Sequence, residues 1–201
     1  MRAKFVNEEH FATVDTDKII TKKYFDLQFN QYASDYVDAY RMEERIPDNE
    51  SDEEIENSKE FKNWYRYELE ARLEEALDKI SSKIKPDGTI DIWRAMLVAP
   101  TWFDHLIKEG QRLGKYWTYE KDAAEPHWGY NDNDKNVLVV LKTSVKEEYV
   151  DWFETLRLNT ETFNEEKEIR LFKNTPIKIE SLEIDLQPID LKILKGKIFR
   201  A

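Results

Sequence analysis

Residues 61–99, FKNWYRYELEARLEEALDKISSKIKPDGTIDIWRAMLVA, contain the change of pattern that decides the fold class. In the first half, large apolar residues recur every three or four positions, which predicts an amphipathic helix over about 58–83. This set consists of Phe61, Trp64, Tyr65, Leu69, Leu73, Ala76, Leu77 and Ile80. The turn sequence Lys-Pro-Asp-Gly at 85–88 then ends the helix. The apolar run that follows, at 89–99, predicts a strand.

The chain before this stretch also carries a helical pattern. Residues 24–41 place five aromatic rings on one helix face: Phe25, Phe29, Tyr32, Tyr36 and Tyr40. The acidic segment 45–60 then predicts an exposed loop that opens the second helix. Its acidic residues at 48–56 lack the alternating ligand spacing of an EF-hand, which favours a solvated loop over a calcium site.

After residue 87, where all five glycines lie, short β-type segments dominate the sequence. Strands are predicted at 136–145, 168–172, 175–185 and 190–200, together with a short helix at 101–114. Helices first and strands later indicate an α+β fold, not alternating βαβ units. We therefore expect a helical N-terminal region at 1–85, followed by a mixed β core at 86–201.

The composition excludes several classes of function. The 201 residues include 42 Asp and Glu against 31 Lys and Arg, a formal charge of -11, whereas stable nucleic-acid binding needs clustered positive charge. The chain has no cysteine, which removes disulfides, thiolate metal sites and a cysteine nucleophile. Its three histidines, His10, His105 and His127, are far apart, so no metal is expected. Without a signal peptide or an apolar run of about 20 residues, we expect a cytoplasmic protein with no membrane partner.

Three segments of the second part carry candidate chemistry. Arg94 stands in an otherwise apolar strand, and residues 115–129, KYWTYEKDAAEPHWG, gather aromatic and hydroxyl side chains. The third segment, FNEEKE at 163–168, runs directly into the next strand. Because strand residues two apart point to one face, Glu166 and Glu168 are expected side by side. Two carboxylates that close repel each other unless a cation or a substrate accompanies them.

The order of these segments resembles the arginine–serine–glutamate class of mono-ADP-ribosyltransferases. That family includes bacterial toxins and enzymes that phages inject into or express in their hosts. The resemblance covers about residues 89–185: IWRAM resembles the arginine strand, YWTYEKDAA the Ser-x-Ser segment, and FNEEKEIRLF the acceptor-recognition turn and Glu-x-Glu pair. It implies a β core of the ADP-ribosyltransferase type, acting in the cytoplasm, the host's own if the chain is phage-encoded.

The resemblance also implies a reaction and a role for each matching residue. The enzyme would pass ADP-ribose from NAD to an arginine of a protein acceptor, without a metal. Glu168 would hydrogen-bond a ribose hydroxyl and stabilise the ribosyl cation, and Thr118 would orient Glu168. Arg94 would hold the pyrophosphate or the nicotinamide ribose. Glu166 would orient or deprotonate the acceptor, and Phe163 would contact the target protein.

The NAD-binding segment departs from the family at two positions. Ala95 follows the arginine where the family often has glycine, and Tyr116 occupies the position of the first serine. Trp117 or Tyr119 would flank the nicotinamide ring. The two departures keep open a second hypothesis, a catalytically degenerate relative that binds NAD without turning it over.

Structural interpretations of the same residues are also open. Arg94 can pair with a buried carboxylate, and Glu166 and Glu168 can be edge-strand charges that prevent aggregation. Residues 146–159, with three aromatic side chains, can form a wall of the acceptor surface or a helix that packs those rings into the core. A third hypothesis is a non-enzymatic acidic protein that occupies a partner's basic site, although the basic residues are interspersed with the acidic ones.

Overall fold

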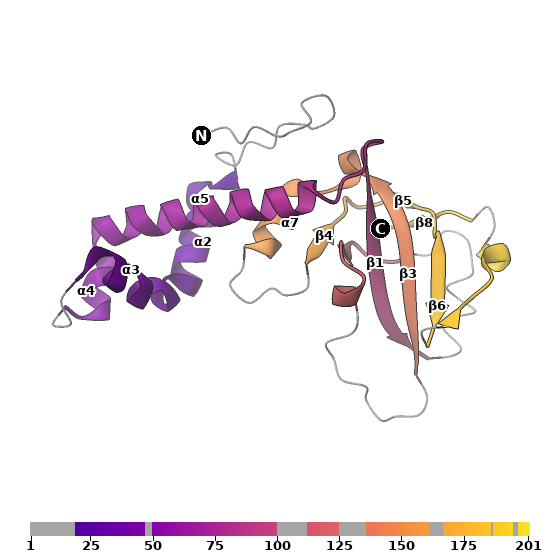
Figure 1. Cartoon of the computed structure of the whole chain (residues 1–201), viewed down its shortest axis with the longest axis horizontal. Coiled ribbons are helices and arrows are strands. Elements are labelled where there is room, and N and C mark those ends of the chain that lie inside the picture. Colours follow the sequence, from indigo (N-terminus) through magenta and orange to yellow (C-terminus); the bar gives the residue numbers. More distant parts are fainter. Residues whose placement is uncertain are drawn as a thin grey trace. The chain divides into compact units, whose positions relative to one another are not determined.

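A computed structural model describes residues 19–46, 50–99, 112–124, 136–160, 167–185, 187–194 and 197–201. Within these ranges helices come first and strands follow, an α+β arrangement (Figure 1). The chain divides into two compact units: unit 1 contains residues 1–79 and 160–163, and unit 2 contains residues 80–159 and 164–201. The division falls inside the long helix, at 79/80, six residues before the boundary at 85/86 that the sequence predicts.

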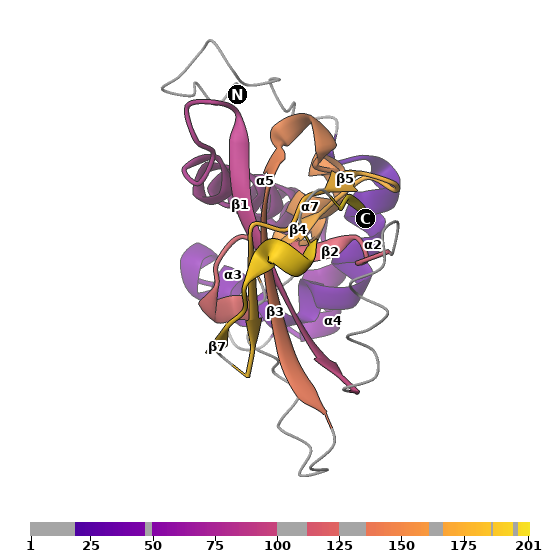
Figure 2. The same ribbon diagram turned by 90° about the vertical axis from the view of Figure 1, so that its right-hand side faces the viewer.

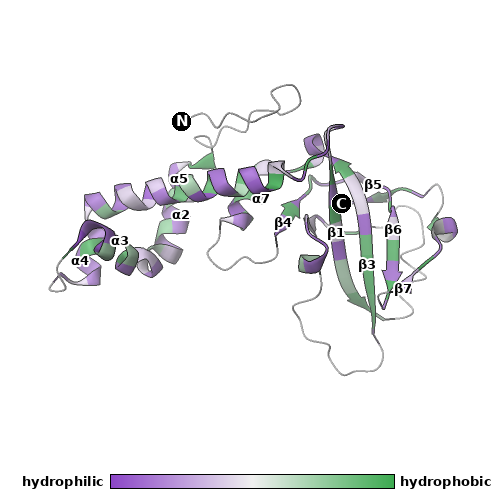
Figure 3. Cartoon of the chain, in the orientation of Figure 1, coloured by the Kyte–Doolittle hydropathy of each residue, from purple (hydrophilic) through white to green (hydrophobic). Residues whose placement is uncertain are grey.

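Unit 1 is helical. Its elements are α2 (Lys22–Tyr32), the 3₁₀ helix η1 (Ala33–Tyr36), α3 (Val37–Glu44), α4 (Asp52–Asn57) and the greater part of α5 (Lys59–Ser81). The helix predicted at 24–41 is therefore present, with one 3₁₀ turn inside it. Along α5, apolar and polar residues alternate in short groups, as the amphipathic pattern requires (Figure 3).

The core of unit 1 is built from aromatic rings. Tyr65 of α5 is fully buried and makes edge-on contacts with Phe29 and Tyr36, at centroid distances of 5.3 and 5.5 Å. Phe61, one turn earlier, contacts Tyr40 at 5.1 Å. Such edge-on pairs are a favoured geometry and add about 0.5–1.5 kcal/mol each beyond their buried area. The aromatic spacing in the sequence thus marks the face that packs against α5.

Part of the acidic segment is helical, contrary to the loop predicted over 45–60. Helix α4 begins after Ser51, whose hydroxyl accepts the N–H of Glu54 at 3.3 Å. The Glu54 carboxylate in turn accepts the backbone N–H of Ser51 at 3.0 Å. This reciprocal capping box stabilises the start of the helix.

Unit 2 contains a six-stranded antiparallel sheet in the order β4-β2-β1-β3-β6-β7 (Figures 1 and 2). Its strands are β1 (Thr89–Val98), β2 (Tyr116–Thr118), β3 (Val137–Lys146), β4 (Glu168–Arg170), β6 (Ser181–Ile184) and β7 (Gln187–Pro188). A second sheet pairs β5 (Pro176–Ile177) with β8 (Phe199–Arg200). The short helices are η2 (Asp122–Ala124), η3 (Glu147–Tyr149), α7 (Trp152–Asn159) and η4 (Leu191–Leu194).

The pairing of β1 with β3 forms the centre of the sheet. Ten residue pairs run from Thr89 opposite Lys146 to Val98 opposite Val137 without interruption. Ile92 and its partner Thr143 are fully buried on one face, whereas Asp91 and its partner Ser144 lie on the other, polar face. This alternation fixes the face to which every side chain of β1 points.

Two predicted strands are shorter than expected. The strand predicted at 190–200 begins with the 3₁₀ helix η4, because the Asp190 side chain accepts the N–H of Lys192 at 2.9 Å and turns the backbone. Only Phe199–Arg200 of that segment is a strand. The strand predicted at 175–185 is split into β5 and β6. Most of the predicted helix at 101–114 lies outside the described residues.

Candidate functional site

The three segments that carry candidate chemistry lie on three adjacent strands. Arg94 is on β1, Thr118 on β2 and Glu168 on β4, and β2 lies between the other two. Thr118 is directly opposite Glu168 in the β2–β4 pair and directly opposite Trp93 in the β1–β2 pair. Residues directly opposite one another in an antiparallel pair point to the same face. Trp93, Thr118 and Glu168 therefore form a row across the sheet, on its polar face.

Arg94 is the residue after Trp93 in β1, so its side chain points to the opposite face of the sheet. The resemblance implies that Arg94 and Glu168 both contact NAD, and we therefore expect their side chains in one cleft; the register instead directs them to opposite faces of the sheet. Beyond the Trp93–Thr118 pair, however, β1 and β2 have no further residue pair, and Arg94 Nη1 donates to the backbone carbonyl of Tyr116. Burial lowers the pKa of Arg94, and the negative charge of Glu168 raises it. Glu168 therefore interacts electrostatically with Arg94, although the two side chains point to opposite faces of the sheet.

Gly114 provides the surface on which this guanidinium lies. Its φ is +86°, and a Cβ built on it would lie 3.0 Å from both Nη1 and Nη2 of Arg94. The Gly114 carbonyl accepts the indole N–H of Trp117 at 3.0 Å, which holds the turn in place. Only glycine fits here without displacing the guanidinium, because it tolerates positive φ and has no side chain.

One hydrogen-bond donor of the Arg94 guanidinium is not used within the described part of the chain. Its Nε is buried and has no hydrogen-bond partner among the described residues, although the residue as a whole is only half-buried. A buried donor without a partner is uncommon in native structures and is often explained by an absent ligand or water. The planar fork of a guanidinium suits the oxygens of a phosphate. An anion of that kind would satisfy the donor.

The aromatic residues of β2 divide between core and surface. Trp117 is 2 % exposed and Tyr119 is 7 % exposed, so both rings belong to the core. The expectation that one of them flanks the nicotinamide ring stays a prediction. Tyr116 is 46 % exposed, and the Arg170 guanidinium lies 5.8 Å from its ring centroid. The available ring is therefore Tyr116, on the same face as Glu168.

The Thr118 hydroxyl is engaged with the backbone in a local turn. It accepts the N–H of Glu120 at 3.3 Å and lies 3.2 Å from the Glu120 carbonyl. Thr118 is buried, with its side chain on the face of Glu168. The register places Thr118 and Glu168 opposite each other on one face, while the Thr118 hydroxyl hydrogen-bonds the backbone of Glu120.

The backbone around Glu168 is fixed from two sides. The Asn159 side chain donates to the Glu168 carbonyl at 2.6 Å, and the N–H of Tyr119 donates to the Lys167 carbonyl at 3.1 Å. Glu166 and Phe163 lie outside the described residues. Residues 152–159 form helix α7, as one of the two interpretations of the segment 146–159 predicts. The aromatic rings of this segment do not fill the core, because Phe153 is exposed and Tyr149 and Trp152 are only half-buried.

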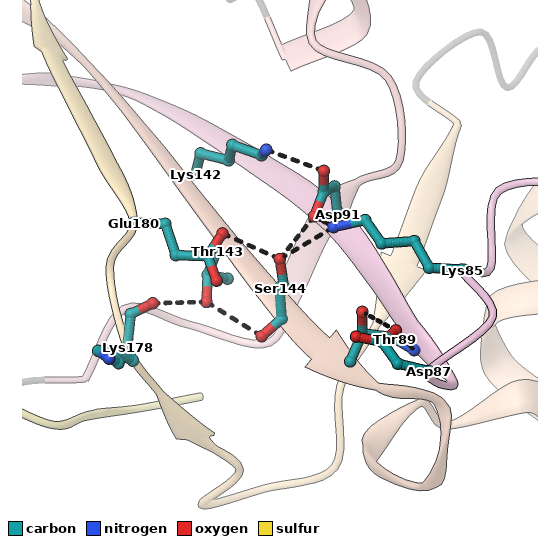
Figure 4. A network of polar contacts seen from close by, with 9 residues as sticks. All are labelled: Lys85, Asp87, Thr89, Asp91, Lys142, Thr143, Ser144, Lys178 and Glu180. Atoms are coloured by element: carbon teal, nitrogen blue, oxygen red, sulfur yellow. Dashed lines mark hydrogen bonds and ion pairs between the residues drawn. The ribbon is translucent and has the colours of Figure 1, made fainter.

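A second polar cluster lies on the same face of the sheet, around Asp91 (Figure 4). Its carboxylate contacts Lys85 at 2.5 Å, Lys142 at 2.8 Å and the Ser144 hydroxyl at 2.5 Å. Burial alone would raise the pKa of Asp91, but the bonds from Lys142, Lys85 and Ser144 lower it to about 2. The bond to Asp91 raises the pKa of Lys85, so this lysine stays protonated and cannot act as a base for Ser144. The cluster is an ion-pair network that stabilises the fold.

No protein-family model matches the chain, and neither the curated proteins nor the solved structures contain a match. Among the described residues, no three histidine, aspartate or glutamate side chains are grouped so that they could hold a metal ion. No helix in the described part of the chain is both long enough and apolar enough to cross a membrane.

Proposed function

We propose that the chain is an NAD-dependent mono-ADP-ribosyltransferase with a protein acceptor, and that its β core is of the ADP-ribosyltransferase type. One observation carries the proposal: the arginine strand, the hydroxyl strand and the glutamate strand are adjacent, with Thr118 directly opposite Glu168. Arg94 and Glu168 are 74 positions apart in the sequence, and the order β4-β2-β1 leaves one strand, β2, between the strands that carry them.

The proposed reaction breaks the bond between nicotinamide and ribose. Nicotinamide leaves with the bonding electron pair, and the ribose carbon becomes cationic in the transition state. A fixed negative charge next to that carbon stabilises the cation, which is the role proposed for Glu168. An acceptor guanidinium nitrogen then bonds to the same carbon and gives up a proton, which Glu166 would receive. The reaction needs no metal.

The guanidinium of Arg94 supports the binding half of this proposal. It is held against Gly114 and the Tyr116 carbonyl, and within the part of the chain that the structure describes its buried Nε has no hydrogen-bond partner. We assign Arg94 to a phosphate oxygen or to the ribose of NAD. The exposed ring of Tyr116, next to Arg170, is the better candidate to stack on a ring of NAD than the buried Trp117 or Tyr119.

One experiment separates this proposal from its alternatives. The purified chain is incubated with a bacterial lysate and NAD labelled in its ADP-ribose part, with Glu168→Gln as the matched variant. Labelled protein bands with the parent chain alone support the transferase. Binding of NAD without label or nicotinamide release supports a degenerate relative. Neither binding nor label supports a non-enzymatic acidic protein.

A further inference from the structure

Lys167, the residue between the two glutamates, has an unusual backbone. Its φ is +50°, in the left-handed region that non-glycine residues seldom adopt. For a residue with a Cβ this conformation costs roughly 1–2 kcal/mol. Strain of this kind persists only where surrounding contacts enforce it, and it occurs often at functional sites. The contacts of Lys167 therefore indicate what enforces the conformation.

Both the backbone and the side chain of Lys167 are tied to the segment that follows β2. Its carbonyl accepts the N–H of Tyr119 at 3.1 Å, and its Nζ forms an ion pair with the Glu120 carboxylate. The other oxygen of Glu120 contacts Lys83 Nζ at 3.2 Å. The hydrogen bond from Lys167 lowers the pKa of Glu120, so its carboxylate is charged at neutral pH.

Glu120 is itself held next to the candidate site. Its N–H is bound by the hydroxyl of Thr118, the residue that faces Glu168 across the β2–β4 pair. The chain of contacts thus runs from Thr118 through Glu120 to Lys167, which is bonded directly to Glu168. Lys167 is thus held to the segment after β2 by its carbonyl and by its side chain, and its own peptide bond leads to Glu168.

We propose that Lys167 and Glu120 form a positioning pair that sets the direction in which Glu168 leaves the chain. The inference rests on the proposed function, since it concerns the geometry of the same reaction. Neither residue needs to contact NAD. The alternative is an ordinary surface ion pair, which contributes about 0–1 kcal/mol to stability and nothing to turnover.

Three substitutions of Lys167 separate the side-chain contact from the backbone strain. Lys167→Met removes the charge and keeps the length, Lys167→Arg keeps the charge, and Lys167→Gly removes the contact while relieving the positive φ. We expect Lys167→Met and Lys167→Gly to lower kcat for nicotinamide release roughly ten- to a hundredfold, since small misplacements cost that much. KM for NAD stays within about twofold, because the pair acts on a catalytic group. Lys167→Arg retains most of the activity.

Stability distinguishes the pair from a merely structural contact. The melting temperature of Lys167→Gly should equal or exceed that of the parent, although its kcat is low. Glu120→Gln should lower kcat as Lys167→Met does, and the double variant should be no worse than either single one. The matched control is Lys121→Met, which breaks an exposed ion pair with Glu183 at 2.8 Å on the same sheet and should leave kcat unchanged.

The outcomes are distinguishable from a failure of the proposed function. If the parent chain releases nicotinamide and Glu168→Gln does not, but Lys167→Met, Lys167→Gly and Glu120→Gln match the parent, the positioning pair is overturned and the proposed function stands. A fall in kcat that follows the melting temperature across all variants, Lys121→Met included, also overturns the pair. If the parent chain releases no nicotinamide, the proposed function fails and the pair fails with it.

Discussion

The Arg94 guanidinium lies so close to Gly114 that a Cβ at this glycine would approach Nη1 and Nη2 to 3.0 Å. Gly114→Ala should therefore displace Arg94 and raise KM for NAD roughly ten- to a hundredfold, which corresponds to the loss of a charge-assisted bond. Substrate-saturation curves of nicotinamide release measure this effect.

Gly88 provides the control for this change. Its φ is also positive, +74°, but a Cβ there would meet only Glu147 at an ordinary 3.7 Å. Both alanine variants should lose about 1–2 kcal/mol of stability from the strained backbone. Only Gly114→Ala should change KM. An equal rise in KM for Gly88→Ala would show that backbone strain, and not the position of Arg94, is responsible.

Tyr116 and Trp117, neighbours in β2, should respond in opposite ways to substitution by alanine. Trp117→Ala should cost about 3–5 kcal/mol of stability, because it removes a buried ring. Tyr116→Ala should leave the free energy of unfolding within about 1 kcal/mol and raise KM for NAD, while Tyr116→Phe retains the ring and the affinity. Urea denaturation and NAD titration of the three variants test the division. Unchanged NAD affinity in Tyr116→Ala would remove Tyr116 from the site.

Substitutions at Glu166 and Phe163 should affect transfer of ADP-ribose to the acceptor without affecting hydrolysis of NAD. Glu166→Gln should leave hydrolysis of NAD intact and abolish transfer to arginine, because water can still reach the cation whereas a guanidinium needs a base. Phe163→Ala should weaken labelling of a protein target and spare turnover of free NAD. Both activities are measured side by side on each variant. Parallel loss of both activities in either variant would show that the roles are not separable.

The network around Asp91 predicts a pH dependence of stability. The pKa of Asp91 is about 2 in the folded chain, below its ordinary value of 3.8. Because the pKa of Asp91 is lower in the folded chain than in the unfolded chain, its charge stabilises the fold by about 1–2 kcal/mol at pH values above the unfolded-state pKa. This stabilisation is lost as the pH falls through the folded-state pKa. Asp91→Asn should thus be less stable than the parent at pH 7, with the difference shrinking between about pH 4 and pH 2.

Urea denaturation at several pH values measures this difference. Asp190→Asn is the control, because Asp190 is an exposed carboxylate whose ion pair with Lys192 is 3.2 Å long, and an asparagine oxygen can still accept the N–H of Lys192. It should change stability by less than about 0.5 kcal/mol at every pH. A difference between Asp91→Asn and the parent that stays constant down to pH 2.5 would mean that the carboxylate charge is not the source of the stability.

The sequence predicted the long elements well because their periodicity extends over many residues. The apolar spacing of α5 and the β-branched run of β3 each contain enough repeats to define one type of element. Helix α4 and the 3₁₀ turn at 191–194 were missed because single side-chain bonds decide them, from Ser51 and Asp190. Short elements of this kind leave little pattern in a sequence.

The resemblance singled out Arg94, Thr118 and Glu168, and the sequence could not show to which face each side chain points. The structure places their strands, β1, β2 and β4, next to one another in the sheet. The face to which each side chain points depends on register, and one pair, Trp93 opposite Thr118, sets it for β1 and β2. The same register determines that the Tyr116 ring points to the exposed face and the Trp117 ring to the buried one. The left-handed backbone of Lys167 had no signal in the sequence.

The most direct test of the account is nicotinamide release from NAD by the purified chain, measured for the parent, Glu168→Gln and Glu183→Gln under the same conditions. Glu183 is the control because it lies on β6, which β1 and β3 separate from β2, and its carboxylate is already paired with Lys121. We expect release by the parent and by Glu183→Gln, a fall of roughly 10²–10³ in kcat for Glu168→Gln, and little change in NAD affinity. Equal release by the parent and Glu168→Gln, or no release by the parent, would contradict this expectation.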